Sequence, residues 1–337
     1  MEITLVLDKV TSNFLIFLIV TPIVSLLCYL GYKFFNSSMG MHLLMGTDKS
    51  EIPLDELEPV YHKKKYQNDT YEFTIYDNGI DSYATISKYI AFDTEKTLAI
   101  PGFLEIDDKK IPIRAIDESV FKNDKSLEKV IIPETIETIS NNVFSFSSLS
   151  EIVLHKDIKK ICRSAFANCK LSNLFLDGFE EILIEENAFS WSSIEYLKLT
   201  KNIHIEKGSF HGSHIKKLEI TTDVIELKPD LFAWCDFPEV IIPEGITEIP
   251  SNCFYGCNNL KKIYIPNSVD FIYDSAFKTY KTSHVHKKDG SWDLRYNSYS
   301  YEENLDLIIY CNGGSYAQEF AKKNNFKCRP ATEYNLT

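Results

Sequence analysis

A phenylalanine returns along this chain at nearly constant intervals. The eight positions are separated by 21 to 23 residues and are Phe121, Phe144, Phe166, Phe189, Phe210, Phe232, Phe254 and Phe277. A period between about 20 and 50 residues is typical of solenoids, in which each repeat forms one stacked coil. The spacing therefore predicts a repeat architecture, and a residue that recurs in every coil is expected to fill the core.

Apolar residues between the phenylalanines keep a second register. Triplets such as Val130-Ile131-Ile132 and Ile263-Tyr264-Ile265 place apolar residues two apart, which is the period of a strand with one buried face. We therefore expect residues 101–280 to form about eight coils of 21 to 23 residues that share a parallel β ladder. The coils from Phe144 to Phe232 lack the Ile-Pro step that follows some triplets, so the pattern gives no support for a second strand there.

The full repeat is clearest in residues 254 to 277. Its members there are Phe254, Cys257, Leu260, Ile263, Ile265, Pro266, Val269, Ile272, Ala276 and Phe277. This pattern resembles the leucine-rich repeats of BspA-like proteins, the bacterial surface antigen type, and the resemblance covers about 97 to 328. It implies a leucine-rich-repeat solenoid displayed outside the cell for binding, but it does not name the partner, because function lies in sites placed on a scaffold.

Caps are expected at both ends, because terminal coils would otherwise expose apolar faces. Within 70–100, Tyr71 to Tyr76 and Tyr83 to Tyr89 alternate like two strands joined by a turn, which predicts an N-terminal β cap. Within 305–337, Leu307 to Tyr310 predicts a last strand. Ser315 with Gln318 forms a capping box, which predicts a short helix that runs to about Lys323.

A long uncharged segment lies near the start of the chain. After a short flank at 1–9, residues 10–32 carry no charge and are mostly apolar, long enough for one transmembrane helix. A cleaved signal peptide is the competing reading, but Glu2 and Asp8 offset Lys9 and bulky residues follow the apolar run. We expect an uncleaved single-pass anchor, followed by a spacer at 33–69.

The orientation of this anchor is a separate question. Lys9 stands on one side of it and Lys33 with Lys49 on the other, which leans slightly toward repeats in the cytoplasm. The family resemblance implies the opposite, with the repeats outside. We expect an extracellular domain; the alternative is a cytoplasm-facing structural or regulatory protein that docks a membrane partner.

Several functional classes find no support. The net charge of −12 and the absence of a basic stripe argue against a nucleic-acid partner. No P-loop, GxGxxG, HExxH or nucleophile elbow is present, so no enzyme, cofactor or metal site is predicted. Cys253 and Cys257 have no second pair or histidine at zinc-like spacing.

Seven cysteines lie outside the anchor. Cys169, Cys235 and Cys257 each stand three residues after a repeat phenylalanine, where we expect small buried hydrophobes. If the domain lies outside the cell, Cys311 and Cys328 are the expected disulfide.

Two sets of residues are candidates for ligand binding. The middle residue of each strand triplet must point away from the core, and these residues are Ile131, Val153, Phe175, Lys198, Glu219, Ile241 and Tyr264. Five of the seven are apolar or aromatic, and such a stripe either binds a ligand or is covered by a cap. The second set lies in an inserted segment, 281–304, that reads as a hairpin around Asp289-Gly290 and carries His284, His286, Trp292 and Tyr296.

The sequence therefore predicts a membrane-anchored, non-catalytic repeat scaffold. Its expected partner is a protein or a glycan at the cell surface, as for an adhesin, and neither a cofactor nor a nucleic acid is expected.

Overall fold

The computed structural model describes residues 61–91, 96–172, 174, 176, 178–282, 299–303 and 306–334. These residues fall within one compact unit, Val60–Thr337. The flank, the expected anchor at 10–32 and most of the expected spacer lie outside the described residues. Within the described part of the chain, no helix has the length and apolar character needed to cross a membrane.

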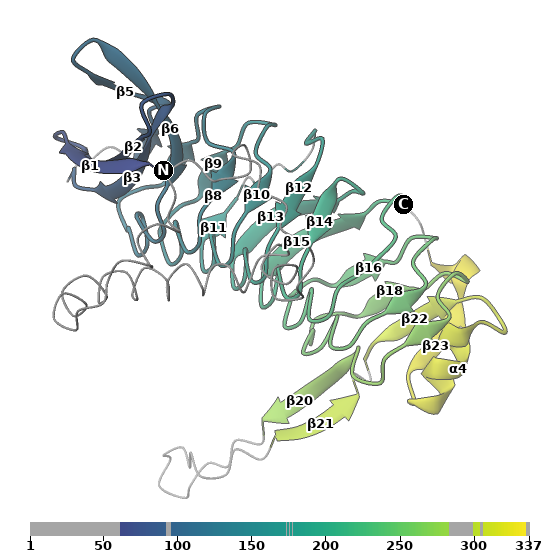
Figure 1. Ribbon diagram of the computed structural model, residues 1–337. Helices are drawn as coiled ribbons and strands as arrows, with labels where there is room; N and C mark the ends of the chain where they lie inside the picture. The colour runs from purple at the N-terminus through teal and green to yellow at the C-terminus, as the bar shows by residue number, and fades with distance from the viewer. Residues whose placement is uncertain are drawn as a thin grey trace, which may run out of the picture. The chain divides into compact units, whose positions relative to one another are not determined.

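A five-stranded sheet precedes the coils (Figure 1). Its strands, in spatial order, are β1 (His62–Gln67), β2 (Tyr71–Asp77), β3 (Ser82–Tyr89), β6 (Lys109–Ile116) and β5 (Phe103–Ile106). The two expected strands of the cap are confirmed as the antiparallel pair β2 and β3. The turn between them is held by Asp77, whose Oδ1 accepts a 2.8 Å hydrogen bond from the Gly79 amide.

Strand β1 corrects one sequence-based expectation. It lies in the segment 33–69 that was expected to be a spacer, and it pairs with β2 along its whole length. Its sequence, HKKKYQ, is almost entirely polar, and five of its six residues are exposed. Because an edge strand of this kind has no buried face, it lacks the alternation by which a strand is recognised.

The first strands of the coils form three parallel sheets within the described residues. The first contains β4 (Thr97–Ala99), β7 (Lys129–Ile131) and β9 (Glu151–Val153); the second contains β11 (Lys170–Leu171), β13 (Ser193–Leu199) and β15 (His214–Ile220); the third contains β16 (Glu239–Ile241), β18 (Lys262–Tyr264), β22 (Ile308–Cys311) and β23 (Lys327–Pro330). In the coil after Phe166, Leu174 and Leu176 are buried as expected, and the described strand of this coil is β11. The middle residue of that triplet, Phe175, lies outside the described residues.

Second strands run through the middle of the solenoid, where the sequence pattern gave no support for them. They form the parallel sheet β14-β12-β10-β8 from β8 (Thr138–Ile139), β10 (Lys160–Ile161), β12 (Ile182–Ile184) and β14 (Ile203–Ile205), and β17 (Glu248–Ile249) pairs with β19 (Phe271–Ile272) further along. Isoleucines such as Ile139, Ile161 and Ile184 pair in register and are buried. Stacking these side chains needs no proline, so the missing Ile-Pro step does not remove the strand.

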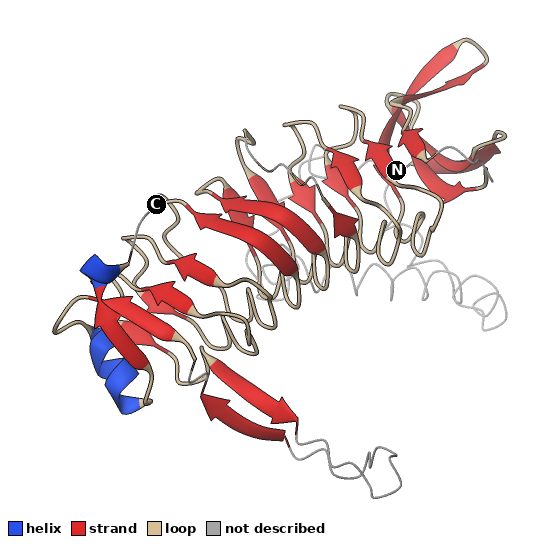
Figure 2. Cartoon of the chain, turned by 180° about the vertical axis from the view of Figure 1, so that it is seen from behind, coloured by secondary structure: helices blue, strands red, loops and turns tan. Residues whose placement is uncertain are grey.

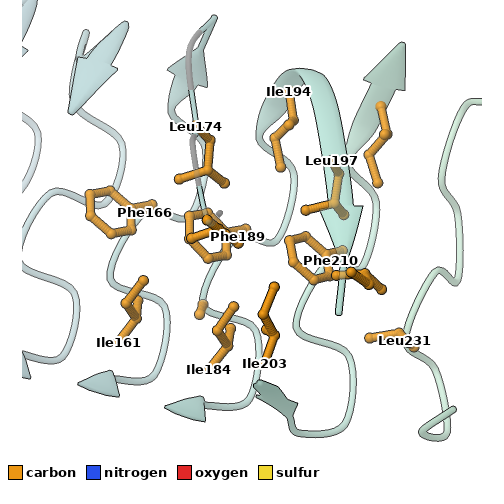
Figure 3. Close-up of a cluster of buried hydrophobic side chains, with 14 of the residues drawn as sticks. Ile161, Phe166, Leu174, Ile184, Phe189, Ile194, Leu197, Ile203, Phe210 and Leu231 are labelled. Atoms are coloured by element: carbon orange, nitrogen blue, oxygen red, sulfur yellow. The ribbon is translucent and has the colours of Figure 1, made fainter. Parts of the chain in front are cut away.

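The eight repeat phenylalanines stack in a single file, which we call the phenylalanine column. Successive ring centroids are 5.3 to 6.1 Å apart with interplanar angles of 2 to 21°. None of the eight is more than 2% exposed. Figure 3 shows Phe166, Phe189 and Phe210 in a row between isoleucines of the second strands and apolar residues of the opposite wall. The predicted solenoid core is confirmed.

Both ends of the column are closed by aromatic rings. At the first coil Tyr89 of β3 lies 5.2 Å from Phe121, centroid to centroid. At the last coil Phe277 meets Phe320 and Phe326, each at 6.1 Å. These two rings come from the expected C-terminal cap, so the apolar end of the array is not left open to water.

The helix of the C-terminal cap, α4 (Tyr316–Lys323), follows the prediction closely. Ser315 is its N-cap and accepts a hydrogen bond from the Gln318 amide at 3.3 Å. The Gln318 side chain returns to the Gly314 amide at 3.0 Å, and Asn324 ends the helix. Strand β23 and the short 3-10 helix η3 (Ala331–Glu333) complete the cap beyond it (Figure 2).

The insertion after Phe277 begins and ends in a described strand pair. The strands β20 (Lys278–Thr282) and β21 (Tyr299–Glu303) are antiparallel, and Figures 1 and 2 show them extending away from the coils. The segment between them, with His284, His286, Trp292 and Tyr296, lies outside the described residues.

Candidate binding surfaces

The outward residues of the strand triplets meet in pairs across neighbouring strands. We call this surface the ladder face. The in-register pairs are Ile131 with Val153, Lys198 with Glu219, and Ile241 with Tyr264. Phe175 lies outside the described residues. The ladder face therefore has three segments with different chemistry.

The N-terminal segment is apolar and open. Ile131 is 37% exposed and Val153 is 39% exposed. Two residues earlier on the same strands, Lys129 and Glu151 form an ion pair at 2.6 Å. The N-terminal segment is therefore a small apolar patch bordered by an ion pair.

The middle segment is polar. Lys198 Nζ lies 3.7 Å from Glu219, whose carboxylate also accepts a 2.5 Å hydrogen bond from the Tyr196 hydroxyl. Lys217 stands over the ring of Tyr196, 5.4 Å from its centroid. These groups satisfy one another, so this segment separates the apolar ends of the face.

The C-terminal segment is partly covered by the cap. Tyr310 follows Tyr264 in register, and both rings contact Tyr334, which lies just beyond η3. The ring centroid of Tyr334 lies 5.9 Å from that of Tyr264 and 5.0 Å from that of Tyr310. Burial raises the pKa of Tyr334 to about 12. Ile241, 39% exposed, is left beside this cover.

A second surface, which the sequence reasoning missed, lies two residues beyond each of the first seven repeat phenylalanines. We call it the turn ridge, and its residues are Asn123, Phe146, Asn168, Trp191, Gly212, Trp234 and Gly256. All seven have φ between +55° and +75°. The amide of each donates to a carbonyl of the next coil; for example, Phe146 donates to Ala167 at 2.7 Å and Trp191 to His211 at 2.8 Å. The sequence does carry a signal, because asparagine and glycine, which tolerate this conformation, alternate here with large aromatic residues.

Trp191 and Trp234 lie against the glycine of the following coil. A Cβ added to Gly212 would stand 2.5 to 2.7 Å from three indole atoms of Trp191, and one added to Gly256 would stand 2.8 to 3.2 Å from Trp234. Trp191 also meets His211 edge-on at 5.7 Å between centroids. Burial lowers the pKa of His211, an effect that the charge of Asp230 opposes.

The position three residues beyond the phenylalanine has a polar role as well as a packing role. The thiols of Cys169, Cys235 and Cys257 are buried as expected, and each donates to the phenylalanine carbonyl of the preceding coil at 3.0 Å. Ser213 makes the same bond, to Phe189, at 2.6 Å. From Ser147 to Cys257 this position therefore holds a small donor, which is either serine or cysteine.

Cys311 and Cys328 are the cysteines that the sequence predicts as a disulfide pair. The thiols of Cys311 and Cys328 are free, with sulfur atoms 3.2 Å apart, so the expected disulfide stays a prediction for oxidising conditions. Within the part of the chain that the structure describes, no three His, Cys, Asp or Glu side chains are grouped to hold a metal ion.

The coils and their open faces define a leucine-rich-repeat solenoid. The model of the BspA type leucine rich repeat region matches six copies in residues 114–236, 180–306 and 225–328, which together span well over half of the chain. The chain therefore belongs to the BspA-type leucine-rich-repeat family, as the resemblance implied. No curated protein matches it.

Solved structures of other leucine-rich-repeat proteins are similar to the chain. One from Bacteroides ovatus is 18% identical, with 73% of this chain and 71% of that chain covered and a TM-score of 0.38. A leucine rich cell surface protein from Faecalibacterium prausnitzii is 18% identical, covers 64% of this chain and 92% of its own, and has a TM-score of 0.24. The pneumococcal vaccine antigen PcpA is 16% identical, with coverages of 75% and 65% and a TM-score of 0.35.

Proposed function

We propose that the chain is a repeat scaffold at the cell surface that binds a protein or glycan partner without catalysis. The observation that carries the proposal is the contrast between inward and outward positions of the strands. Inward side chains are apolar in every coil and, apart from the partly buried Leu154 and Leu218, buried. Outward side chains differ between coils and leave Ile131, Val153 and Ile241 exposed. A rigid stack with a varied surface is suited to recognition.

Residues 10–32 would tether this scaffold to the membrane as a single-pass anchor. The support is the length and apolar character of the segment and its lack of charge. Family membership supports placing the repeats outside the cell. Protease treatment of intact cells tests both points: digestion of the repeats supports display, whereas protection until the membrane is permeabilised supports the cytoplasmic alternative.

Binding through the ladder face is testable with the full chain. We expect Ile131→Asp with Val153→Asp to remove capture of a surface partner, because a carboxylate at each position would have to be desolvated in the contact. Ile225→Asp is a matched control, since Ile225 is 77% exposed away from the ladder face. Capture that survives the double substitution would exclude the N-terminal segment of the ladder face. Capture that is lost when 283–298 is deleted would place the contact on the insertion.

A further inference from the structure

The turn ridge holds large aromatic residues in a backbone conformation that disfavours them. Phe146, Trp191 and Trp234 have φ of +59°, +57° and +64°. This left-handed region suits glycine and asparagine, and those residues occupy the same place in the other coils. Such outliers concentrate at functional sites, where the surrounding structure holds them in place.

Two of the three aromatic residues also remain open to solvent, whereas Trp234 is partly buried and meets Tyr255 edge-on at 5.6 Å between ring centroids. Trp191 is 55% exposed and Phe146 is 46% exposed, although apolar groups of this size are normally buried. The core does not need them, because the phenylalanine column is complete without them. Strain and exposure together indicate that these side chains are kept for a contact outside the chain.

The aromatic residues recur on every second coil. Phe146, Trp191 and Trp234 alternate with the small residues Asn168, Gly212 and Gly256. Coils stacked at the strand spacing place alternate coils about 10 Å apart. A ligand that contacts the whole row must therefore be extended along the solenoid axis and must repeat at about the length of two sugar units.

Trp191 is held as a flat platform. The Cβ position of Gly212 is nearly equidistant, at 2.5 to 2.7 Å, from three atoms around the shared bond of the Trp191 indole, so one ring face lies on the glycine. With that face covered and 55% of the residue exposed, the open surface is the opposite face. The imidazole of His211 meets the indole at an interplanar angle of 67°, with 5.7 Å between the ring centroids.

We propose that the turn ridge binds an extended neutral glycan, whose sugar rings stack on Trp191, Trp234 and Phe146. The negative face of an aromatic ring attracts the C–H bonds of a sugar ring, and a flat, open indole provides that face. This proposal rests on the binding role proposed above and gives it a second surface and a ligand class.

Charge selects the neutral glycan over charged polymers. The chain carries a net charge of −12, which repels anionic polysaccharides and nucleic acids. The nearby ammonium of Lys125 is engaged by the Phe146 carbonyl at 2.5 Å, and the exposed His214 is paired with Asp236 at 3.0 Å. Base stacking on aromatic residues normally requires a positively charged groove, which these pairs do not supply.

The test is affinity electrophoresis of the full chain in gels that contain hydroxyethyl cellulose, galactomannan or laminarin, with alginate as the anionic comparison. We expect at least one neutral polymer to retard the protein and alginate to leave its mobility unchanged. Trp191→Asn should weaken the retardation at least tenfold and Trp191→Phe should restore part of it. Because asparagine adopts the left-handed conformation readily, Trp191→Asn separates loss of the platform from loss of the fold. Its thermal unfolding is measured alongside.

Phe103→Ala is the matched control, since Phe103 is an exposed aromatic residue on β5, outside the turn ridge. The proposal is overturned if no neutral polymer is bound, if Trp191→Asn binds as well as the native chain, or if alginate alone is bound. A chain that keeps partner capture through Ile131 and Val153 while failing this test would retain the proposed function and lose the glycan site. A chain that no longer captures the partner but is still retarded by a neutral polymer would keep the glycan site and lose the proposed function.

Discussion

The phenylalanine column and the turn ridge lie two residues apart in the first seven coils, yet they follow different rules. At the column, all eight positions carry the same residue and are buried. At the turn ridge, the conformation is constant but the residue changes among asparagine, glycine, phenylalanine and tryptophan. Constancy in the core maintains the stack, whereas variation at the surface distinguishes this chain from any other stack of the same coils.

The largest expected effect tests the column directly. Phe189→Ala should lower the free energy of unfolding by about 3 to 5 kcal/mol, because it leaves a cavity between two stacked rings. Phe146→Ala, the same change at the turn ridge, should alter it by no more than about 0.5 kcal/mol. Urea unfolding followed by circular dichroism measures both. Equal losses would mean that the ridge residue is part of the core.

The next prediction concerns the glycine under the indole. Gly212→Ala should lower the free energy of unfolding by roughly 2 kcal/mol, because it combines left-handed strain with displacement of Trp191. Gly314→Ala separates the two causes, since Gly314 has φ of +76° and no atom within 4 Å of an added Cβ. Gly314→Ala should lower the free energy of unfolding, measured by thermal unfolding, by only about 1 kcal/mol. Identical losses would show that the indole does not rest on the glycine.

How far the sequence could predict the molecule follows from the same comparison. The regular spacing of residues such as Phe189 predicts that they are buried. The core, its closure by α4 and the repeat family could therefore all be predicted. The strand β1 could not be predicted, because its lysines are exposed and it has no buried face. The second strands in the middle could not be predicted from the Ile-Pro step, because that step is missing there. Trp191 was overlooked because periodicity draws attention to what repeats, and this residue departs from the repeat.

A smaller effect is expected one residue beyond the turn ridge, at the buried donor. Cys235→Ala should lower the free energy of unfolding by about 1 kcal/mol, since the Phe210 carbonyl loses its 3.0 Å bond. Cys235→Ser should retain most of the stability, because Ser213 already makes this bond in the neighbouring coil. Chemical denaturation of the two variants checks this, and a greater loss for serine than for alanine would contradict the donor role.

The smallest effect is a pH dependence. Burial raises the pKa of Cys169 to about 11 and of Cys257 to about 12. Below the usual thiol pKa, both the folded and the unfolded chain keep these protons; above it, the unfolded chain loses them first. The free energy of unfolding should therefore fall as pH rises from about 9 toward 11, by roughly 1 kcal/mol or less per thiol at pH 9.5. Cys257→Ser should have a shallower slope, and an unchanged slope would exclude this thiol as a cause.

The run of lysines in β1 has a consequence for how molecules of this kind meet one another. β1 is the outer strand of its sheet, and Lys63, Lys64 and Lys65 are exposed along it. A different sheet, β16-β18-β22-β23, has β23 as an outer strand. This strand ends at Pro330, which has no amide hydrogen to donate. Charge and proline on open strand edges oppose the addition of a further chain, so a protein built by stacking identical elements is discouraged from polymerising into fibres.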